Sequence, residues 1–579
     1  MAERIVSPGV FTREQDTSFL TPAPAEVSTA VVGPAVKGPI DIPTVVRSYG
    51  EYVAVYGDRF KSGSNYYQHL TSLAAEKYFE QGGDSLLVTR VAPSLYSSAT
   101  AEILSGSTAL VTLQTIGEGA IFTNSGSATE NLADGALLSG SADNVRWEVA
   151  NVSPDLGTFD IIVRRGDDNH KNKIILETFN NVSLDPNSDN YVSKRIGDVS
   201  YSVNGSDIIE SGEYPNQSSY VRVSAVGVQM PDYFDNAGVA KTAYSASLAD
   251  ISTLGSGSYH GTFAGGDGAL DAAGANFFEN INGTNTQGLT VTTNAVTDYN
   301  NAISVLGNKE AFNFNVLLTP GLYQEHHATT VGSFIDLVED RGDAIYIADL
   351  TQYGATVNDA TGANGAQGLN SSFAAAYWPW VKVQAQGIGR QVWAPASSVM
   401  GGVLAFNDSV AAEWFAPAGL IRGGIPGVIR AERKLSRTDR DTLYSKKVNP
   451  LATFPGSGVV AYGQKTLQTK ASALDRVNVR RLLITLKRFI GAQANNLVFE
   501  QNTIATRNRF LSIVNPYLEN VIQRQGLYAF RVVMDDTNNT ADVIDRNQLV
   551  GQIFIQPTKT AEFIVLDFVV EPTGAAFGA

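Results

Sequence analysis

The stretch that decides the fold is residues 449–489, which reads NPLATFPGSGVVAYGQKTLQTKASALDRVNVRRLLITLKRF. Pro455, Gly456 and Gly458 predict a turn, because Pro and Gly are the residues that tight turns favour. The apolar residues 459–462 that follow predict a strand. After a polar stretch, apolar side chains recur at helical spacing over residues 474–492, so a basic amphipathic helix is expected there.

The predicted helix carries its cations beside its apolar face. The apolar face consists of Val477, Leu482, Leu483, Leu486 and Ile490. The cations are Arg480, Arg481, Lys487 and Arg488. This pattern is typical of a surface helix whose long cationic side chains cover apolar surface while their charges stay in water. It also fits a helix that presents a positive surface to a partner, and the sequence leaves both interpretations open.

Length and composition indicate a protein of several packed domains. A chain of 579 residues predicts three or four domains. Hydrophobic residues make up 43% and charged residues 17%, which favours folded domains over a disordered chain. The sequence has no Cys, so disulfides and thiolate metal sites are excluded. We expect neither a signal peptide nor a membrane-spanning segment, because no apolar run approaches the length of about 20 residues that a membrane helix needs.

The charge is unevenly distributed along an acidic chain. The net charge is −15, yet residues 420–531 contain 19 Lys and Arg against 6 Asp and Glu. Such a block can bind nucleic acid, or it can bind an acidic surface on a second copy or on another protein. The second interpretation is favoured, because the block shows apolar periodicity and contains no nucleic-acid-binding motif.

Sequence patterns divide the chain into five segments. Residues 1–20 have too little apolar surface for a core and predict either a frayed terminus or a strand donated to a neighbour. Residues 21–95 alternate strand and helix patterns. Residues 96–232 predict a β-rich inserted domain, with Asn204-Gly205 as a hairpin turn. Residues 233–400 read as α/β and residues 401–579 as a C-terminal core, so the fold class expected is a multidomain α+β protein.

Short blocks spread along the chain, together with residues 449–570, resemble the sheath proteins of contractile phage tails, such as those of T-even phages and cyanophages. The blocks are SPGV at 7–10, VGPAVKGP at 32–39, LLVTRV at 86–91, ETFNNVSLDP at 177–186, GGDG at 265–268, YWPWV at 377–381 and APAS at 394–397. The resemblance is weakest over residues 96–176. It implies an α/β core built from both chain ends, residues 21–95 with 401–579, into which the β-rich domain and a non-catalytic, subtilisin-like α/β domain are inserted.

The resemblance also implies a function and partners. Subunits are expected to form hexameric rings that stack helically around a tail tube, and to contract so that the tube is driven through the host envelope. The partners implied are further copies, the tube protein, and baseplate and tail terminator proteins, in a virion tail assembled in the host cytoplasm. Neither nucleic acid nor direct membrane insertion is expected.

The resemblance assigns roles to two sets of residues. The four cations at 480, 481, 487 and 488 are candidates to face the tube. The candidates for strands exchanged between subunits are Ile5, Val6, Val10, Phe11, Phe563, Ile564, Val565 and Leu566.

Three alternatives remain open in the sequence. One is the sheath of a contractile injection machine that is not a phage, and another is a nucleic-acid-binding protein. The third is a hydrolase, since an Asp…His…Ser order runs through Asp267, His326 or His327, and Ser397 or Ser398. The segment around these serines lacks the Gly-Thr-Ser-Met-Ala pattern of subtilisin-like proteases. The chain also lacks a GxxxxGK[ST] nucleotide motif, and the two adjacent histidines make a poor metal site, so no cofactor and no catalysis are expected.

Overall fold

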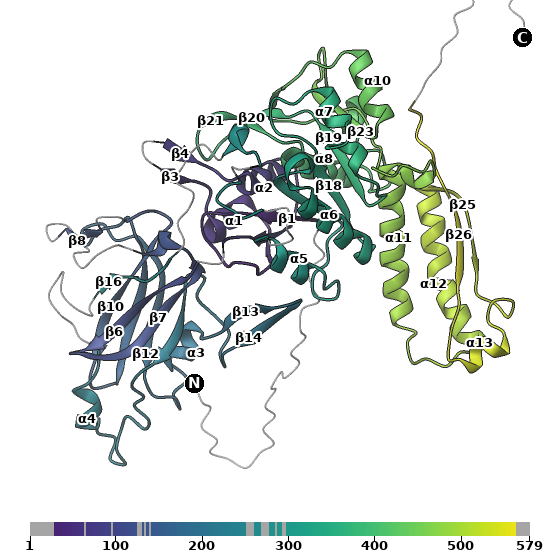
Figure 1. Ribbon diagram of the computed structural model, residues 1–579. Coiled ribbons are helices and arrows are strands. Elements are labelled where there is room, and N and C mark those ends of the chain that lie inside the picture. Colours follow the sequence, from purple (N-terminus) through teal and green to yellow (C-terminus); the bar gives the residue numbers. More distant parts are fainter. Residues whose placement is uncertain are drawn as a thin grey trace, which may run out of the picture.

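A computed structural model describes residues 28–62, 65–93, 96–123, 130–131, 135–137, 140–249, 260–267, 277–283, 286–291 and 297–562. Three parts follow one another across the molecule: a β-rich part, an α/β core, and a pair of long helices packed beside a β-hairpin (Figure 1). The candidates for exchanged strands at residues 5–11 and 563–566 lie outside the described residues.

The core is built on one eight-stranded sheet in the order β2-β5-β1-β17-β18-β19-β23-β24. Six neighbouring strands are parallel: β5 (Leu86–Arg90), β1 (Thr29–Gly33), β17 (Val316–Tyr323), β18 (Ile345–Asp349), β19 (Ala374–Trp378) and β23 (Val448–Phe454). Antiparallel strands β2 (Thr44–Val46) and β24 (Gly458–Ala461) form its two edges.

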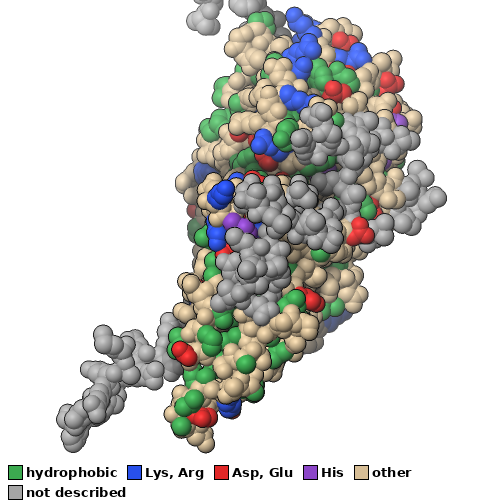
Figure 2. Space-filling model, turned by 90° about the vertical axis from the view of Figure 1, so that its left-hand side faces the viewer, with side chains coloured by type: hydrophobic (Ala, Val, Ile, Leu, Met, Phe, Trp, Pro, Cys, Tyr) green, Lys and Arg blue, Asp and Glu red, His purple; other side chains and the backbone are tan. Residues whose placement is uncertain are grey.

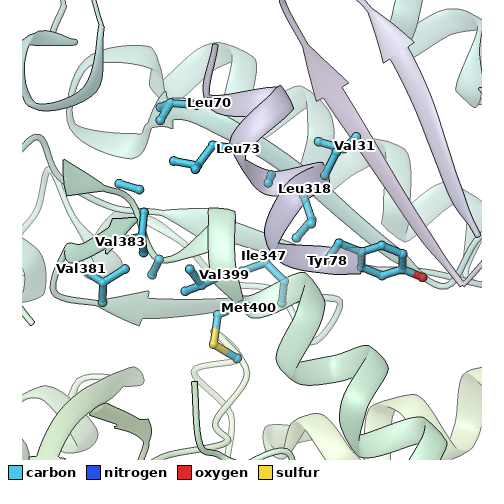
Figure 3. Packing of buried hydrophobic residues seen from close by; sticks show 14 of the residues in the cluster. Val31, Leu70, Leu73, Tyr78, Leu318, Ile347, Val381, Val383, Val399 and Met400 are labelled. Atoms are coloured by element: carbon cyan, nitrogen blue, oxygen red, sulfur yellow. The ribbon is translucent and has the colours of Figure 1, made fainter. Parts of the chain in front are cut away.

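Helices cover both faces of this sheet, which explains why its central strands are apolar almost throughout. Alternate side chains enter two clusters, so that Val31 and Leu318 face one side while Leu317 faces the other. On the first side, α2 (Leu70–Glu80) and α8 (Ser397–Val410) pack against the strands, and Figure 3 shows Leu73, Tyr78, Val399 and Met400 meeting there. On the second side lie α5 (Asn300–Leu306) and α6 (Gln324–Arg341).

The remaining elements of the core are short and surround the sheet. They are α1 (Tyr49–Tyr56), β3 (Phe60–Ser62), β4 (Asn65–Tyr67), α7 (Val357–Thr361), β20 (Val381–Ala385), β21 (Arg390–Ala394), α9 (Gly419–Arg422), β22 (Val428–Ala431) and α10 (Arg437–Ser445).

The sheet corrects the predicted division of the core. Residues 233–400 were expected to form a separate α/β domain, but they supply β17, β18 and β19, which lie between β1 and β23 in the same sheet. Because parallel strands must be buried on both faces, these segments cannot form two independent cores. The mixed α/β fold with several sheets agrees with the predicted α+β multidomain class.

The β-rich part packs two sheets, β12-β11-β10-β16 and β15-β7-β6, around one hydrophobic cluster. Tyr233, Leu248 and Phe263 belong to this cluster, so the β-rich part extends past the predicted boundary at residue 232. Its elements are β6 (Ser98–Ser105), β7 (Thr108–Glu118), β8 (Glu130–Asn131), β9 (Ala136–Leu137), β10 (Val145–Ser153), β11 (Thr158–Arg165), β12 (Ile175–Ser183), α3 (Val192–Ile196), β13 (Ser200–Asn204), β14 (Asp207–Ser211), β15 (Val221–Val226), α4 (Thr242–Ser245) and β16 (His260–Thr262).

The C-terminal part consists of α11 (Val477–Asn495), α12 (Ile504–Gln523), β25 (Leu527–Val533), α13 (Ala541–Asp545) and β26 (Gln552–Pro557). Leu482, Leu486, Phe510, Val514 and Leu518 form a cluster between the two long helices. The predicted strand at 459–462 corresponds to β24, and the predicted helix at 474–492 corresponds to α11. Both predictions are confirmed, with boundaries shifted by a few residues.

Candidate functional site

Helix α11, the strongest functional candidate in the sequence, buries two of its four predicted tube-facing cations. Arg480 is 5% exposed. Its Nε donates a hydrogen bond to the backbone oxygen of Ser372 at 3.2 Å, and its guanidinium lies 3.9 Å from the ring centre of Phe373. Burial lowers its pKa to about 10. The Arg481 side chain is 2% exposed and donates to the Asp408 carboxylate at 2.7 and 2.5 Å.

These contacts correct the prediction for the two arginines. Sequence periodicity placed them beside the apolar face, but α11 packs against the core on this flank as well as against α12. Both guanidinium groups therefore have partners within the chain and do not offer a free positive surface. Lys487 is exposed and Arg488 is half-buried, so these two remain candidates to face a partner.

A groove of about 1250 Å³ lies between the C-terminal part and the core. Its walls combine aromatic rings and cations, contributed by α10, the β23–β24 hairpin, the segment after α8 and the segment after β26. Arg440 lies over the rings of Phe454 and Tyr462 at 5.1 and 5.5 Å, and Arg422 lies over Phe415 at 5.1 Å. The volume exceeds the range of about 300–1,000 Å³ typical of small-molecule pockets and suits a polypeptide segment.

Glu562 lines the groove and is the last described residue of the chain. Its carboxylate accepts hydrogen bonds from Arg476 Nε and Nη2 at 2.7 and 3.0 Å. Tyr444 Oη donates to it at 2.8 Å and Gln464 Nε2 at 3.2 Å. Burial acts to raise the pKa of Glu562, but the hydrogen bonds from Arg476 and Tyr444 outweigh it and hold the pKa below its usual range. These hydrogen bonds therefore hold the Glu562 side chain against Arg476 and Tyr444.

The residues of the hydrolase alternative do not assemble into a triad. Asp267 pairs with Ser97 through a backbone hydrogen bond, and His326 contacts Gln352 at 3.3 Å. Ser397 is fully buried, and its hydroxyl donates to Asp349 at 2.5 Å rather than to a histidine. A serine nucleophile needs a histidine base and access to its substrate, and Ser397 has neither.

The Ser397 contact leads to a prediction about pH. Asp349 ends β18, is 4% exposed, and also accepts the backbone N–H of Ser397 at 3.0 Å. Burial raises its pKa from 3.8 to about 7, although the hydrogen bonds from Ser397 act to lower it. The folded chain thus holds a proton that the unfolded chain releases between these values. The free energy of unfolding should therefore decrease as the pH rises through this range.

Thermal unfolding of the core between pH 5 and pH 8 measures this effect. The variant Asp349→Asn keeps a hydrogen-bonding side chain without a charge, so its stability should vary less with pH than that of the parent chain. The exposed Asp340→Asn serves as the control and should leave the pH dependence unchanged. Equal pH dependence in the parent chain and Asp349→Asn would contradict the prediction.

Other kinds of site find little support in the described part of the chain. No cluster of three or more His, Cys, Asp or Glu side chains there is arranged to hold a metal ion. Among the helices in the described ranges, none is long and apolar enough to cross a bilayer. Figure 2 faces the β-rich end, where charged side chains of both signs are scattered and form no continuous positive stripe on this face.

Comparison with protein families identifies the segments that carry helix α11 and the groove. Residues 290–467 match the phage tail sheath protein central domain, and residues 469–571 match the phage tail sheath C-terminal domain. Residues 290–571 belong to the phage tail sheath family. The two matches confirm the resemblance to sheath proteins drawn from the sequence. Helix α11, the groove and Glu562 all lie within residues 290–571.

Two individual tail sheath proteins are also similar to this chain in sequence. The tail sheath protein of Vibrio phage KVP40 is 45% identical over 188 residues, and that of Enterobacteria phage T4 is 40% identical over 185 residues. Each match covers 32% of this chain and 28% of the relative. The chain thus matches less than a third of the length of these relatives. Neither name denotes an enzyme, in line with the prediction that this chain is not one.

The fold as a whole also resembles that of a sheath protein. The crystal structure of a sheath tail protein from Listeria innocua matches 89% of this chain and 90% of its own length, with a TM-score of 0.52 and 12% identity. The likeness extends beyond residues 290–571, so the sheath fold includes segments that come before the family match.

Proposed function

We propose that this chain is the structural subunit of a contractile tail sheath, which polymerises around a tail tube and contracts to drive the tube through the host envelope. The observation that carries the proposal is the match of residues 290–571 to the two sheath domains. Such a subunit needs extensive surfaces for copies of itself and requires no active site. The non-catalytic, subtilisin-like character expected of the α/β region belongs to the same proposal.

The hairpin β25–β26 supports the proposal as an acceptor for strands from neighbouring subunits. It is a two-stranded sheet that packs against the α11–α12 cluster through Phe530, Ile553 and Ile555, and no third strand pairs with it in the described part of the chain. Tyr528 and Phe554 on its strands are 65% and 55% exposed. A strand added at the edge of a sheet gains main-chain hydrogen bonds and places alternate side chains in pockets.

The donated strands would come from the two ends of the chain. The candidates are Ile5, Val6, Val10 and Phe11 in the arm and Phe563, Ile564, Val565 and Leu566 in the tail. The tail follows Glu562 in the sequence, and Glu562 is held by hydrogen bonds from Arg476 and Tyr444. Linked in this way, subunits would stay connected while their rigid parts rotate.

A head-to-tail contact of this kind joins two different surfaces of the same chain. Such contacts close into rings or continue as helical polymers, which is how hexameric rings would stack along a tube. Contraction then requires two packings of similar free energy and a rigid-body rotation between them. Lys487 and Arg488 are the α11 cations left to face the tube. Baseplate and tail terminator proteins would bind the ends of the polymer, in a virion tail assembled in the host cytoplasm.

Electron microscopy of the purified protein in negative stain tests this proposal. The full chain, alone or mixed with the tube protein, should form hollow helical tubes. Deleting residues 1–20 should abolish the tubes because it removes a donated strand, while circular dichroism of the deletion variant should stay unchanged. The exchange Arg47→Ala, at an exposed position of the core, serves as the matched control and should leave the tubes intact.

The outcomes separate the alternatives. If neither condition yields tubes at high protein concentration, the sheath proposal is wrong. If tubes still form after residues 1–20 are removed, the sheath proposal stands, but the proposed exchange of the N-terminal strand is wrong. A sheath from a contractile injection machine that is not a phage would give the same tubes, and binding to a phage tube protein distinguishes the two.

A further inference from the structure

The hairpin β13–β14 is the least supported element of the β-rich part. It forms a two-stranded sheet of its own, and none of residues 200–214 is buried. Its base is nevertheless fixed, because the Asp198 carboxylate accepts the backbone N–H groups of Glu213 and Tyr214 at 2.9 and 2.8 Å. On the face that carries Tyr201, this side chain is 51% exposed while Val203 and Ile208 are half-buried. Isolated hairpins are marginally stable in water, so a fixed hairpin without buried side chains favours a partner that covers one of its faces.

The two faces of the hairpin differ in chemistry. Directly opposite residues share a face, and the register pairs Tyr201 with Glu210 and Val203 with Ile208. Tyr201, Val203 and Ile208 therefore form an apolar strip that ends at Glu210. The other face carries Ile209 among polar side chains, namely Ser200, Ser202, Asn204, Asp207 and Ser211. We call the first face the apolar strip.

The charges carried by the hairpin strands themselves have a single sign. Residues 200–211 contain Asp207 and Glu210 and neither Lys nor Arg, while Arg222 lies at the base and donates to the backbone oxygen of Asp198 at 3.3 Å. A second hairpin of the same kind would be repelled by these carboxylates. The chemistry of the strip thus calls for a surface that combines apolar contact with positive charge.

The chain itself presents such a surface at residues 429–437. Ile429 is 47% exposed, and the cations Arg430, Lys434 and Arg437 beside it are exposed. We call these four residues the basic ridge. Residues 429–437 contain Arg430, Arg433, Lys434 and Arg437 against one carboxylate, that of Glu432. The cations therefore dominate the ridge.

We infer that the apolar strip of one copy docks on the basic ridge of a second copy. Within one chain the two surfaces are far apart: Figure 1 shows α10, whose first residue is Arg437, at the upper end and the hairpin on the lower side. The contact is therefore between different surfaces of two copies, which is the type that extends into a polymer. The inference rests on the proposed sheath function and names a further contact between its subunits.

Disulfide trapping tests this contact cleanly, because the sequence has no Cys. A full-length chain with Glu210→Cys and Lys434→Cys, oxidised under conditions in which the parent chain forms tubes, should give a ladder of dimers and larger oligomers on a non-reducing gel. Mixing the two single variants should stop at dimers, because each chain then has one thiol. The matched control pairs Ile209→Cys, on the other face of the same hairpin, with Lys434→Cys and should remain mostly monomeric.

Charge exchange gives a second measurement that does not need a disulfide. Glu210→Lys should weaken association roughly fivefold, as expected for loss of an exposed ion pair, and adding Lys434→Glu should restore it. Equal ladders from both faces of the hairpin, or no ladder in a sample that shows tubes, would overturn the docking and leave the sheath function intact. Absence of tubes from the parent chain would overturn the sheath function and this contact with it.

Discussion

Replacing Arg164 with alanine is expected to destabilise the β-rich part by about 3–5 kcal/mol, because it removes a buried guanidinium that bridges two buried carboxylates. The Arg164 side chain has no exposed area. Its Nε and Nη2 donate to the two carboxylate oxygens of Asp168 at 2.7 and 2.8 Å, and its Nη1 donates to Glu148 at 2.8 Å. Arg146 and Lys173 remain near these carboxylates, but neither can reach both of them in the same way.

The network around Arg164 explains the size of the effect. Burial acts to raise the pKa of Glu148, but Lys173 and Arg164 outweigh it and hold the pKa below its usual range. Glu148 is therefore held in its charged form, and removing Arg164 takes one cation from this carboxylate and both guanidinium hydrogen bonds from Asp168. Since the cluster lies within the β-rich part, the core should keep its own stability.

Calorimetry combined with limited proteolysis measures this prediction. The β-rich transition should move to lower temperature while the core transition stays in place. Arg165→Ala is the matched control: it is the next residue on β11, its side chain is 36% exposed, and its partner Asp167 is also exposed. This variant should change stability by no more than about 0.5 kcal/mol. Similar effects of the two substitutions would contradict the assignment of Arg164 to a buried network.

The second large effect is expected for Arg481→Ala, at about 3 kcal/mol for loss of a buried ion pair. Arg481 connects α11 to Asp408 on α8, and thereby joins the C-terminal part to the core. Burial acts to lower its pKa, but the Asp408 carboxylate outweighs it and keeps the pKa above its usual range. Without the guanidinium, the Asp408 carboxylate, whose side chain is 20% exposed, would lose both hydrogen bonds from Arg481.

Comparison with Lys487→Ala separates a structural from a tube-binding role on the same helix. Lys487 is exposed, so its replacement should leave the melting temperature of the purified subunit unchanged. Arg481→Ala should lower that temperature before any tube protein is added. If Arg481→Ala leaves the subunit stable and only weakens tube binding, the burial argument fails and the original tube-facing prediction for Arg481 stands.

Local patterns in the sequence were sufficient to predict individual strands, turns and helices. The apolar run at residues 86–91 became β5, the turn at 455–458 separates β23 from β24, and the periodicity of 474–492 became α11. The blocks shared with sheath proteins also indicated the family. These features depend on residues close in sequence, whose backbone preferences and spacing decide the local structure.

Tertiary structure alone decided which strands share a sheet and which cations stay on the surface. The order that places β17 beside β1 depends on contacts between residues hundreds of positions apart, so residues 233–400 could not be recognised as part of the core. Arg480 and Lys487 lie on the same helix, and periodicity treats both as flanking cations. Only the packing of Ser372, Phe373 and Asp408 against one flank of α11 buries Arg480 and Arg481 and leaves Lys487 exposed.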